Sequence, residues 1–280
     1  MKVTYFGTTT LLFDDGKDQI LFDCHFTRPS LPDYVQNKPA STDQRMVDRM
    51  FQLHKINRLS AIFVSHSHHD HVMDAPYAAK HSGAVIYGSS SVLNVGRGQD
   101  VPEAQLVEYS DGSEYTIGSF RIRILKSLHS KPTFLNNDLG ETIATPLKQP
   151  ARLRDYKEGG SYDFYIEHPE KKILIRPSFN YIPGQLDGIR ADVLFLGVAG
   201  LGKADRETER NFFRETVAKV KPELVIPVHW DNFFSPLDRP AKGMPGVIGK
   251  TETVFFRAAR YCEAKGVDFL VQIPRTSIHI

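Results

Sequence analysis

Short apolar runs separated by turn-forming residues dominate the first part of the chain. Short strand-like runs, broken at Gly7 and at Asp14-Asp15-Gly16, predict three early strands, and Asp15-Gly16 is typical of a hairpin turn. A helical period then brings Met46, Val47, Met50 and Phe51 to one face, which we assign to core packing. The expected elements are strands at 3–6, 9–13 and 19–22 and a helix at 42–54.

Farther along, strand-like and helix-like runs alternate. Strands are expected at 59–64, 84–87, 105–109, 114–117, 120–125, 162–167, 172–175, 191–196, 224–228 and 267–271. Helices are expected at 74–81, 89–95, 204–220 and 254–265. This alternation is typical of an α/β fold, and two β-rich halves that each end in helices suggest an ancient duplication. Because no composition shift marks a boundary, we predict one domain over residues 1–280.

One long segment, residues 132–160, does not fit the alternation. It contains three prolines and the basic residues Arg152, Arg154 and Lys157. Long irregular segments in compact domains often form lids or binding loops, so this segment is predicted to be a lid insertion. A mobile surface loop without a role is the alternative.

Composition narrows the class of protein. The 280 residues are 41% hydrophobic and 24% charged, as in soluble globular proteins, with a formal net charge of +2. This balance gives no electrostatic reason to expect nucleic acid or an anionic membrane as a partner. Two cysteines, Cys24 and Cys262, form no disulfide framework, and no secretory signal or 20-residue apolar span is visible. A cytoplasmic location is expected.

Four candidate metal ligands, His66, His68, Asp70 and His71, stand directly after the strand at 59–64. Imidazole and carboxylate are the usual ligands of zinc and its first-row neighbours. A tight turn would point the first two ligands to one side and the last two to the other. Two ions could then lie about 3.5–4 Å apart, as in two-metal hydrolases. The alternative is a polar loop in which Asp70 caps the following helix.

Two more histidines follow strands. His129 comes after the strand at 120–125, and His229 after the strand at 224–228. Loops converge at strand ends while the strands hold them rigidly, so both histidines are predicted to join the same site.

These residues resemble the metallo-β-lactamase-fold superfamily. Its His-x-His-x-Asp-His motif matches residues 66–71, and the segments KVTYFG, ILFD, ADVLFL and LVIPVHW follow in the family's order. The chain is most similar to a cytosolic metal-dependent hydrolase branch that includes L-ascorbate-6-phosphate lactonase-like proteins. The resemblance implies a four-layer αββα sandwich with two mixed sheets. It also implies a first metal on His66, His68 and His129 and a second on Asp70, His71 and His229.

The sequence departs from this family at one position. Most dinuclear members carry a bridging Asp after the strand that matches 172–175, but this chain has Ser178 and Phe179 there, and Asp187 lies far along the loop. Three interpretations follow: two ions bridged by hydroxide alone, a single working ion, or a decayed site in a non-catalytic binding protein.

The resulting hypothesis is hydrolysis by a metal-bound hydroxide. Asp70 is the candidate catalytic residue, as a ligand and as the acceptor that orients the nucleophile. A small-molecule lactone, ester or amide is the expected substrate, and phosphodiester hydrolysis is the alternative. Two zinc ions are expected, with one ion, manganese or iron as alternatives, and a homo-oligomer is compatible with the sequence.

Several neighbours have two interpretations each. Asp23 either orients a ligand histidine or forms a turn. His25 either borders the site or, as we favour, lies in a surface loop. The arginines at 152, 154 and 176 either bind an anionic substrate group or are solvated. Residues that follow His229 either line the pocket or pack in the core: Trp230, Asn232, Phe233 and Phe234.

Overall fold

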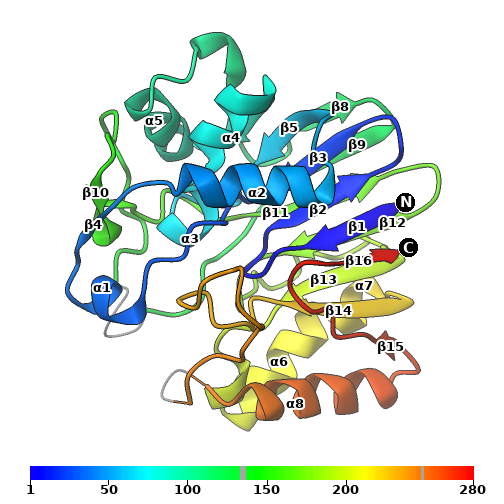
Figure 1. Cartoon of the computed structure of the whole chain (residues 1–280). Helices are drawn as coiled ribbons and strands as arrows, with labels where there is room; N and C mark the ends of the chain where they lie inside the picture. The colour runs from blue at the N-terminus through cyan, green and yellow to red at the C-terminus, as the bar shows by residue number, and fades with distance from the viewer. Residues whose placement is uncertain (133–136, 247–248) are drawn as a thin grey trace.

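Two seven-stranded sheets form the centre of the molecule (Figure 1). The computed structural model describes residues 1–132, 137–246 and 249–280. The first sheet has the order β16 (Thr276–His279), β1 (Lys2–Tyr5), β2 (Leu11–Asp14), β3 (Gln19–Phe22), β5 (Leu59–Phe63), β6 (Val85–Gly88) and β7 (Leu106–Glu108). The second has the order β15 (Asp268–Phe269), β14 (Leu224–Val228), β13 (Val193–Gly197), β12 (Lys172–Arg176), β11 (Tyr162–Glu167), β9 (Phe120–Lys126) and β8 (Glu114–Ile117).

Each sheet is mixed. Strands β16 to β3 pair antiparallel and β3 to β7 pair parallel, while β8 to β12 pair antiparallel and β12 to β15 pair parallel. A separate two-stranded ribbon joins β4 (Pro39–Ala40) to β10 (Ala151–Arg152). Parallel pairing requires crossovers, and helices supply them on the outer faces of both sheets except between β12 and β13, where residues 177–192 form a loop.

Both faces of the first sheet are buried, which explains its continuous apolar runs. In β3, Ile20 and Phe22 face the core between the sheets, whereas Leu21 faces the helices. Strand β5 alternates in the same way, with Phe63 on the inner face and Ile62 on the outer. The strand period of two therefore divides these side chains between two apolar layers.

Helices form the outer layers and complete the four-layer αββα sandwich that the resemblance implied (Figure 1). The first sheet is covered by α2 (Gln44–His54), α4 (Ala75–Ser82) and α5 (Ser90–Gly98). The second is covered by α6 (Arg206–Glu215), α7 (Val217–Val220) and α8 (Thr251–Glu263). The remaining short helices are α1 (Leu31–Val35), α3 (His69–Val72), η1 (Glu103–Gln105), η2 (Leu153–Asp155) and η3 (Leu201–Lys203).

Some sequence expectations differ from the structure. The helix expected at 204–220 breaks at Thr216, whose hydroxyl donates to the carbonyl of Phe212 at 2.7 Å and whose backbone leaves the helical region. The turn expected after β5 contains the one-turn helix α3, and Asp70 lies inside it rather than capping α4. Helix α1 was not expected from the sequence; the Ser30 side chain caps it by accepting from the Asp33 N–H, and Pro32 lies in its first turn.

The segment predicted as a lid is only partly described, since residues 133–136 lie outside the described residues. Its described part forms β10 and η2 and bonds to the body: Ile143 N donates to Ser91 Oγ, and Gln149 donates to the carbonyl of Met73. These contacts fix residues 143–149 on the first half of the chain. Its role as a lid stays a prediction.

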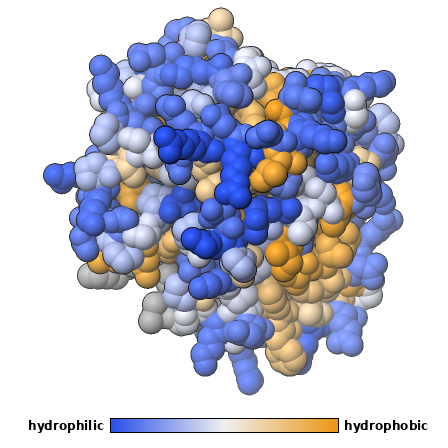
Figure 2. Space-filling view, in the orientation of Figure 1, coloured by the Kyte–Doolittle hydropathy of each residue, from blue (hydrophilic) through white to orange (hydrophobic). Residues whose placement is uncertain are grey.

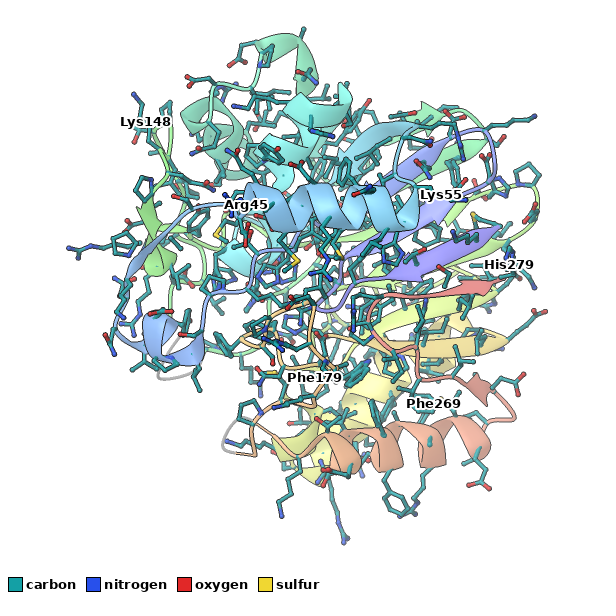
Figure 3. The ribbon with its side chains drawn as sticks, in the orientation of Figure 1. Arg45, Lys55, Lys148, Phe179, Phe269 and His279 are labelled. Atoms are coloured by element: carbon teal, nitrogen blue, oxygen red, sulfur yellow. The ribbon has the colours of Figure 1, made fainter. Side chains whose placement is uncertain are left out.

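The surface is mostly hydrophilic on the face shown in Figure 2, with apolar patches that run right of centre from the upper part to the bottom. The C-terminal part of the chain exposes Phe256, Leu270 and Ile273. Charged side chains such as Arg45, Lys55 and Lys148 are exposed, whereas Phe179 is partly buried against the core (Figure 3). Within the described residues, we find no helix with the length and apolar character that a bilayer crossing needs.

Replacing Phe63 with alanine tests the inter-sheet core. Its ring is fully buried and stacks on Tyr87 at a centroid distance of 4.5 Å. The cavity should lower the free energy of unfolding by about 3–5 kcal/mol in urea denaturation. Phe256→Ala, at a ring that is 63% exposed, is the control and should cost less than about 1 kcal/mol. Equal effects of the two substitutions would contradict this core.

Candidate metal centre

The six predicted ligands converge from three strand ends. His66 and His68 lie in the loop after β5, Asp70 and His71 lie in α3, and His129 and His229 follow β9 and β14. They form two groups, in each of which the ligand atoms lie within 4.8 Å of one another: His66, His68 and His129, and Asp70, His71 and His229. The ring centroids of His66 and His71 are 3.8 Å apart, so the two groups are adjacent.

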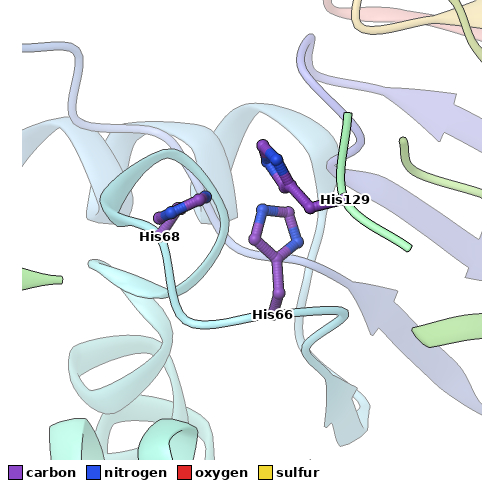
Figure 4. Close-up of side chains that lie close together, drawn as sticks. All are labelled: His66, His68 and His129. Atoms are coloured by element: carbon purple, nitrogen blue, oxygen red, sulfur yellow. The ribbon is translucent and has the colours of Figure 1, made fainter. Parts of the chain in front are cut away.

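Three imidazoles surround one space in the first group (Figure 4). The Nδ1–H of His129 donates to the carbonyl of Ser130 at 3.0 Å, which leaves its Nε2 as a lone-pair donor. His66 Nδ1 lies 3.0 Å from Ser65 Oγ, while its Nε2 is buried without a hydrogen-bond partner. Burial, reinforced by the neighbouring histidines, lowers the pKa of His129 to about 3 and holds the pKa of His66 well below its usual value.

The second group centres on a carboxylate. Asp70 Oδ2 lies 3.5 Å from His71 Nε2 and 3.4 Å from His229 Nε2. Burial acts to raise the pKa of Asp70, but the charge of His71 and a hydrogen bond from His229 hold it well below its usual value. An ionised carboxylate beside two imidazoles is a donor set that suits a divalent cation.

Of the two interpretations of Asp23, its contacts support the one in which it orients a ligand histidine. Its Oδ2 accepts from His71 Nδ1 at 2.7 Å, and its carboxylate also accepts from the Ser65 backbone N–H at 2.7 Å and from the Thr9 hydroxyl. Although burial opposes it, the charge of Asp23 raises the pKa of His71. The carboxylate thus fixes the His71 tautomer and turns Nε2 toward Asp70.

His229 is held by a buried network that the sequence analysis missed. Its backbone N–H donates to the carbonyl of Thr8 at 2.6 Å. Asp231 accepts from the Thr8 N–H at 2.8 Å and the Tyr5 hydroxyl at 2.8 Å, and it pairs with Arg28 at 3.0 Å. This network ties the loop after β14 to the turn after β1. The spacing of Asp231 two residues after His229 was the available signal.

A glycine makes that network possible. Gly7 has a φ of 97°, and a Cβ there would lie 2.0 Å from Arg28 Nη2 and 2.4 Å from Asp231 Oδ2. The close approach of the arginine to the turn therefore requires glycine at this position.

The loop that lacks the bridging Asp holds the first metal group instead. Asn180 Nδ2 donates to the carbonyl of His129 at 2.7 Å, and Phe179 N donates to Ser130 Oγ at 3.0 Å. Arg176 supports this loop by donating to the carbonyl of Asn180 at 2.9 Å while it pairs with buried Asp163 at 3.1 Å. The ring of Phe179 (Figure 3) is partly buried and packs on Phe212 of α6.

The remaining candidates divide between the site and the core. His25 is fully buried, which corrects the surface-loop expectation: Thr10 Oγ accepts its backbone N–H at 3.1 Å, and its ring packs edge-on against His69. His69 belongs to neither ligand group and stacks on Tyr34. Phe233 packs edge-on against His229 at 5.2 Å and borders the site, whereas Trp230 is buried against Phe255.

The arginine alternatives are also resolved in part. Arg176 is 1% exposed and paired with Asp163, so its charge is already compensated. Arg154 donates to the carbonyl of Val35 at the surface. The nearest downstream acid, Asp187, forms a surface pair with Lys219, away from the ligands.

The donor set fits metal ions. Neutral imidazoles and an ionised carboxylate are the protonation states that metal ligation needs. Burial keeps His66 and His129 neutral, and the charge of His71 with the hydrogen bond from His229 keeps Asp70 ionised although burial opposes it. The buried Nε2 of His66 would be costly to leave without a partner. A cation in each of the two groups would satisfy these atoms.

A profile described as a beta-lactamase superfamily domain matches residues 18–230, which include all six candidate ligands. The chain belongs to this superfamily. The match confirms the resemblance that the motif indicated, and the two mixed sheets flanked by helices are its metallo-β-lactamase fold.

Several matching relatives carry the name UPF0173 metal-dependent hydrolase, and two of them illustrate the similarity. The protein of Myxococcus xanthus is 33% identical over 185 residues, or 62% of this chain and 57% of the relative. That of Chloroflexus aurantiacus is 31% identical over 81 residues, or 29% of this chain and 33% of the relative. The matched segments thus span less than two thirds of either relative's own length.

A solved structure shows the same architecture. A metallo-β-lactamase fold protein from Bacillus subtilis aligns with a TM-score of 0.58 at 15% identity, over 99% of each chain. At this identity the similarity concerns the fold alone.

Acid should destabilise the metal-free protein. Unfolded imidazoles titrate near about 6.5, whereas the folded pKa of His66 is lowered and that of His129 is about 3. Their contribution to stability is therefore present above about pH 6.5 and is lost as the pH falls toward the folded values. His71, with its raised pKa, acts in the opposite direction, contributing below about 6.5 and losing that contribution as the pH rises.

Urea unfolding in excess chelator measures this balance. We expect the free energy of unfolding to be lower at about pH 5 than at about pH 7.5, by on the order of 1–2 kcal/mol. His129→Asn should reduce the difference. Equal or greater stability at the lower pH would contradict the neutral-imidazole description of the site.

Proposed function

We propose that this protein is a hydrolase of small-molecule lactones, esters or amides that works with two zinc ions, or with manganese or iron in their place. The observation that carries the proposal is the pairing of two adjacent buried ligand groups, one of three histidines and one of Asp70, His71 and His229. The names of the M. xanthus and C. aurantiacus relatives support metal-dependent hydrolysis.

When bound, the metals would lower the pKa of a coordinated water and polarise the substrate carbonyl. The chain's own residues supply the rest. Asp23, through His71, and Asn180, through the His129 backbone, hold the ligand rings in place. Asp70 stays ionised, so it can both ligate and accept the hydrogen bond that orients the attacking water.

The loop after β12 favours carbonyl over phosphodiester substrates. Its Asn180 and Phe179 are engaged with His129 and Ser130, so no carboxylate from this loop clamps the two ions. The guanidinium of Arg176, at the end of β12, is compensated by Asp163 and is not available for a phosphate.

The setting of the two cysteines supports a cytoplasmic location as part of this proposal. Cys24 and Cys262 are both buried and free, which suits a reducing compartment. A small-molecule substrate rather than nucleic acid is the proposed partner, and a homo-oligomer stays a prediction.

Turnover of a panel of lactones and esters by the zinc-loaded protein tests the proposal, with a phosphodiester beside them. His66→Ala should lower kcat/KM at least about 100-fold, because it removes a ligand. His81→Ala is the matched control, since this histidine lies on α4 and pairs at the surface with Asp48. Hydrolysis that survives His66→Ala, or turnover of the phosphodiester alone, would overturn the proposal.

A further inference from the structure

A carboxylate from residues 137–160 reaches the metal motif. Asp138 places Oδ1 and Oδ2 at 3.1 and 3.2 Å from Nε2 of His68, and both side chains are largely buried, at 14% and 8% exposure. The two residues are 70 positions apart in the sequence. A carboxylate can only accept from the ring, so Nε2 of His68 carries the proton.

This contact decides which nitrogen of His68 is free. With Nε2–H engaged, Nδ1 holds the lone pair that can ligate. Asp138 itself belongs to neither group of converging ligand atoms, so it lies behind the ring. The second group has the same arrangement, because Asp23 accepts from His71 Nδ1 and leaves Nε2 toward Asp70.

We propose that Asp138 is a positioning residue for the first metal group and that residues 137–160 are thereby part of the metal centre. It fixes the tautomer and orientation of His68 and raises the ligand's basicity. Carboxylates in this relation to a ligand histidine typically change metal affinity 10–100-fold. The proposal rests on the metal centre of the proposed function.

Hydrogen bonds to the metal motif hold in place the segment that carries Asp138. Ser67, between the two histidines, donates its N–H to the carbonyl of Glu158 at 2.9 Å. The buried carboxylate of Glu158 accepts from Gly140 N at 2.9 Å, two residues after Asp138, and Gly159 N donates to the carbonyl of Glu141 at 2.9 Å. Both ends of the described segment are thus joined to each other and to the loop after β5.

Close approach at this junction requires glycine. Gly159 has a φ of 68°, and a Cβ there would lie 2.3 Å from Ser67 Oγ. The backbone of the segment therefore packs directly against the motif, with no room for a side chain at Gly159. Asp138 reaches His68 because this junction sets its position.

Zinc affinity, measured by chelator competition without substrate, tests the proposal. Asp138→Asn should weaken one bound ion 10–100-fold. Asp155→Asn is the matched control, since Asp155 lies in the same segment and accepts from the backbone of Arg152 at the surface; its affinity should stay within about twofold. Thermal unfolding without metal should show that the wild-type protein and the two variants are equally folded.

A second readout follows His68 directly. Imidazole nitrogen NMR of the zinc-loaded protein should show His68 protonated at Nε2. The His68 nitrogen resonances should shift in Asp138→Asn and should stay unchanged in Asp155→Asn. Unchanged zinc affinity together with an unchanged His68 resonance would overturn the role of Asp138 alone. A wild-type protein that binds no metal would instead overturn the proposed function, and the role of Asp138 with it.

Discussion

The site depends on the hydrogen bonds that one buried carboxylate, that of Asp23, accepts. It lies at the end of β3 with a φ of 51°, a conformation that a non-glycine residue adopts at a cost of about 1 kcal/mol or more. Its bonds from Ser65, Thr9 and His71 over-determine that conformation. Because these partners come from the turn after β1, the end of β5 and α3, one charged group sets the relative positions of three segments. Both ligand groups include residues carried by these segments, so both depend on that arrangement.

The positions of the ligands follow from this. His66, His129 and His229 stand at strand ends of both sheets, so the rigidity of the sheets passes directly to the rings. The loop after β12 contributes a hydrogen bond instead of a ligand. Its Asn180 donates to the His129 carbonyl, whereas the family that the sequence resembles has its bridging Asp in this loop. Asp70 is left as the carboxylate shared between His71 and His229. The two ligand groups would hold one ion each.

Much of this could be predicted from the sequence, for definite physical reasons. The short continuous apolar runs of β3 and β5 made the strands visible, and the dense run from His66 to His71 has few explanations other than metal. The burial of His25, the network of Asp231 with Arg28, and the contact of Asp138 with His68 could not be predicted. Each depends on side chains brought together from distant segments, and a single polar residue in a loop gives no local signal of its partner. The break at Thr216 was missed because its hydroxyl bond competes with a strong helical period.

Metal content per chain, determined by elemental analysis of protein purified without chelator, tests the central claim most directly. The account of two adjacent ligand groups predicts about two equivalents of zinc, manganese or iron. His66→Ala should then lower the value toward about one. No bound metal after reconstitution would contradict the account, and a single equivalent that His229→Ala leaves unchanged would contradict the second ligand group.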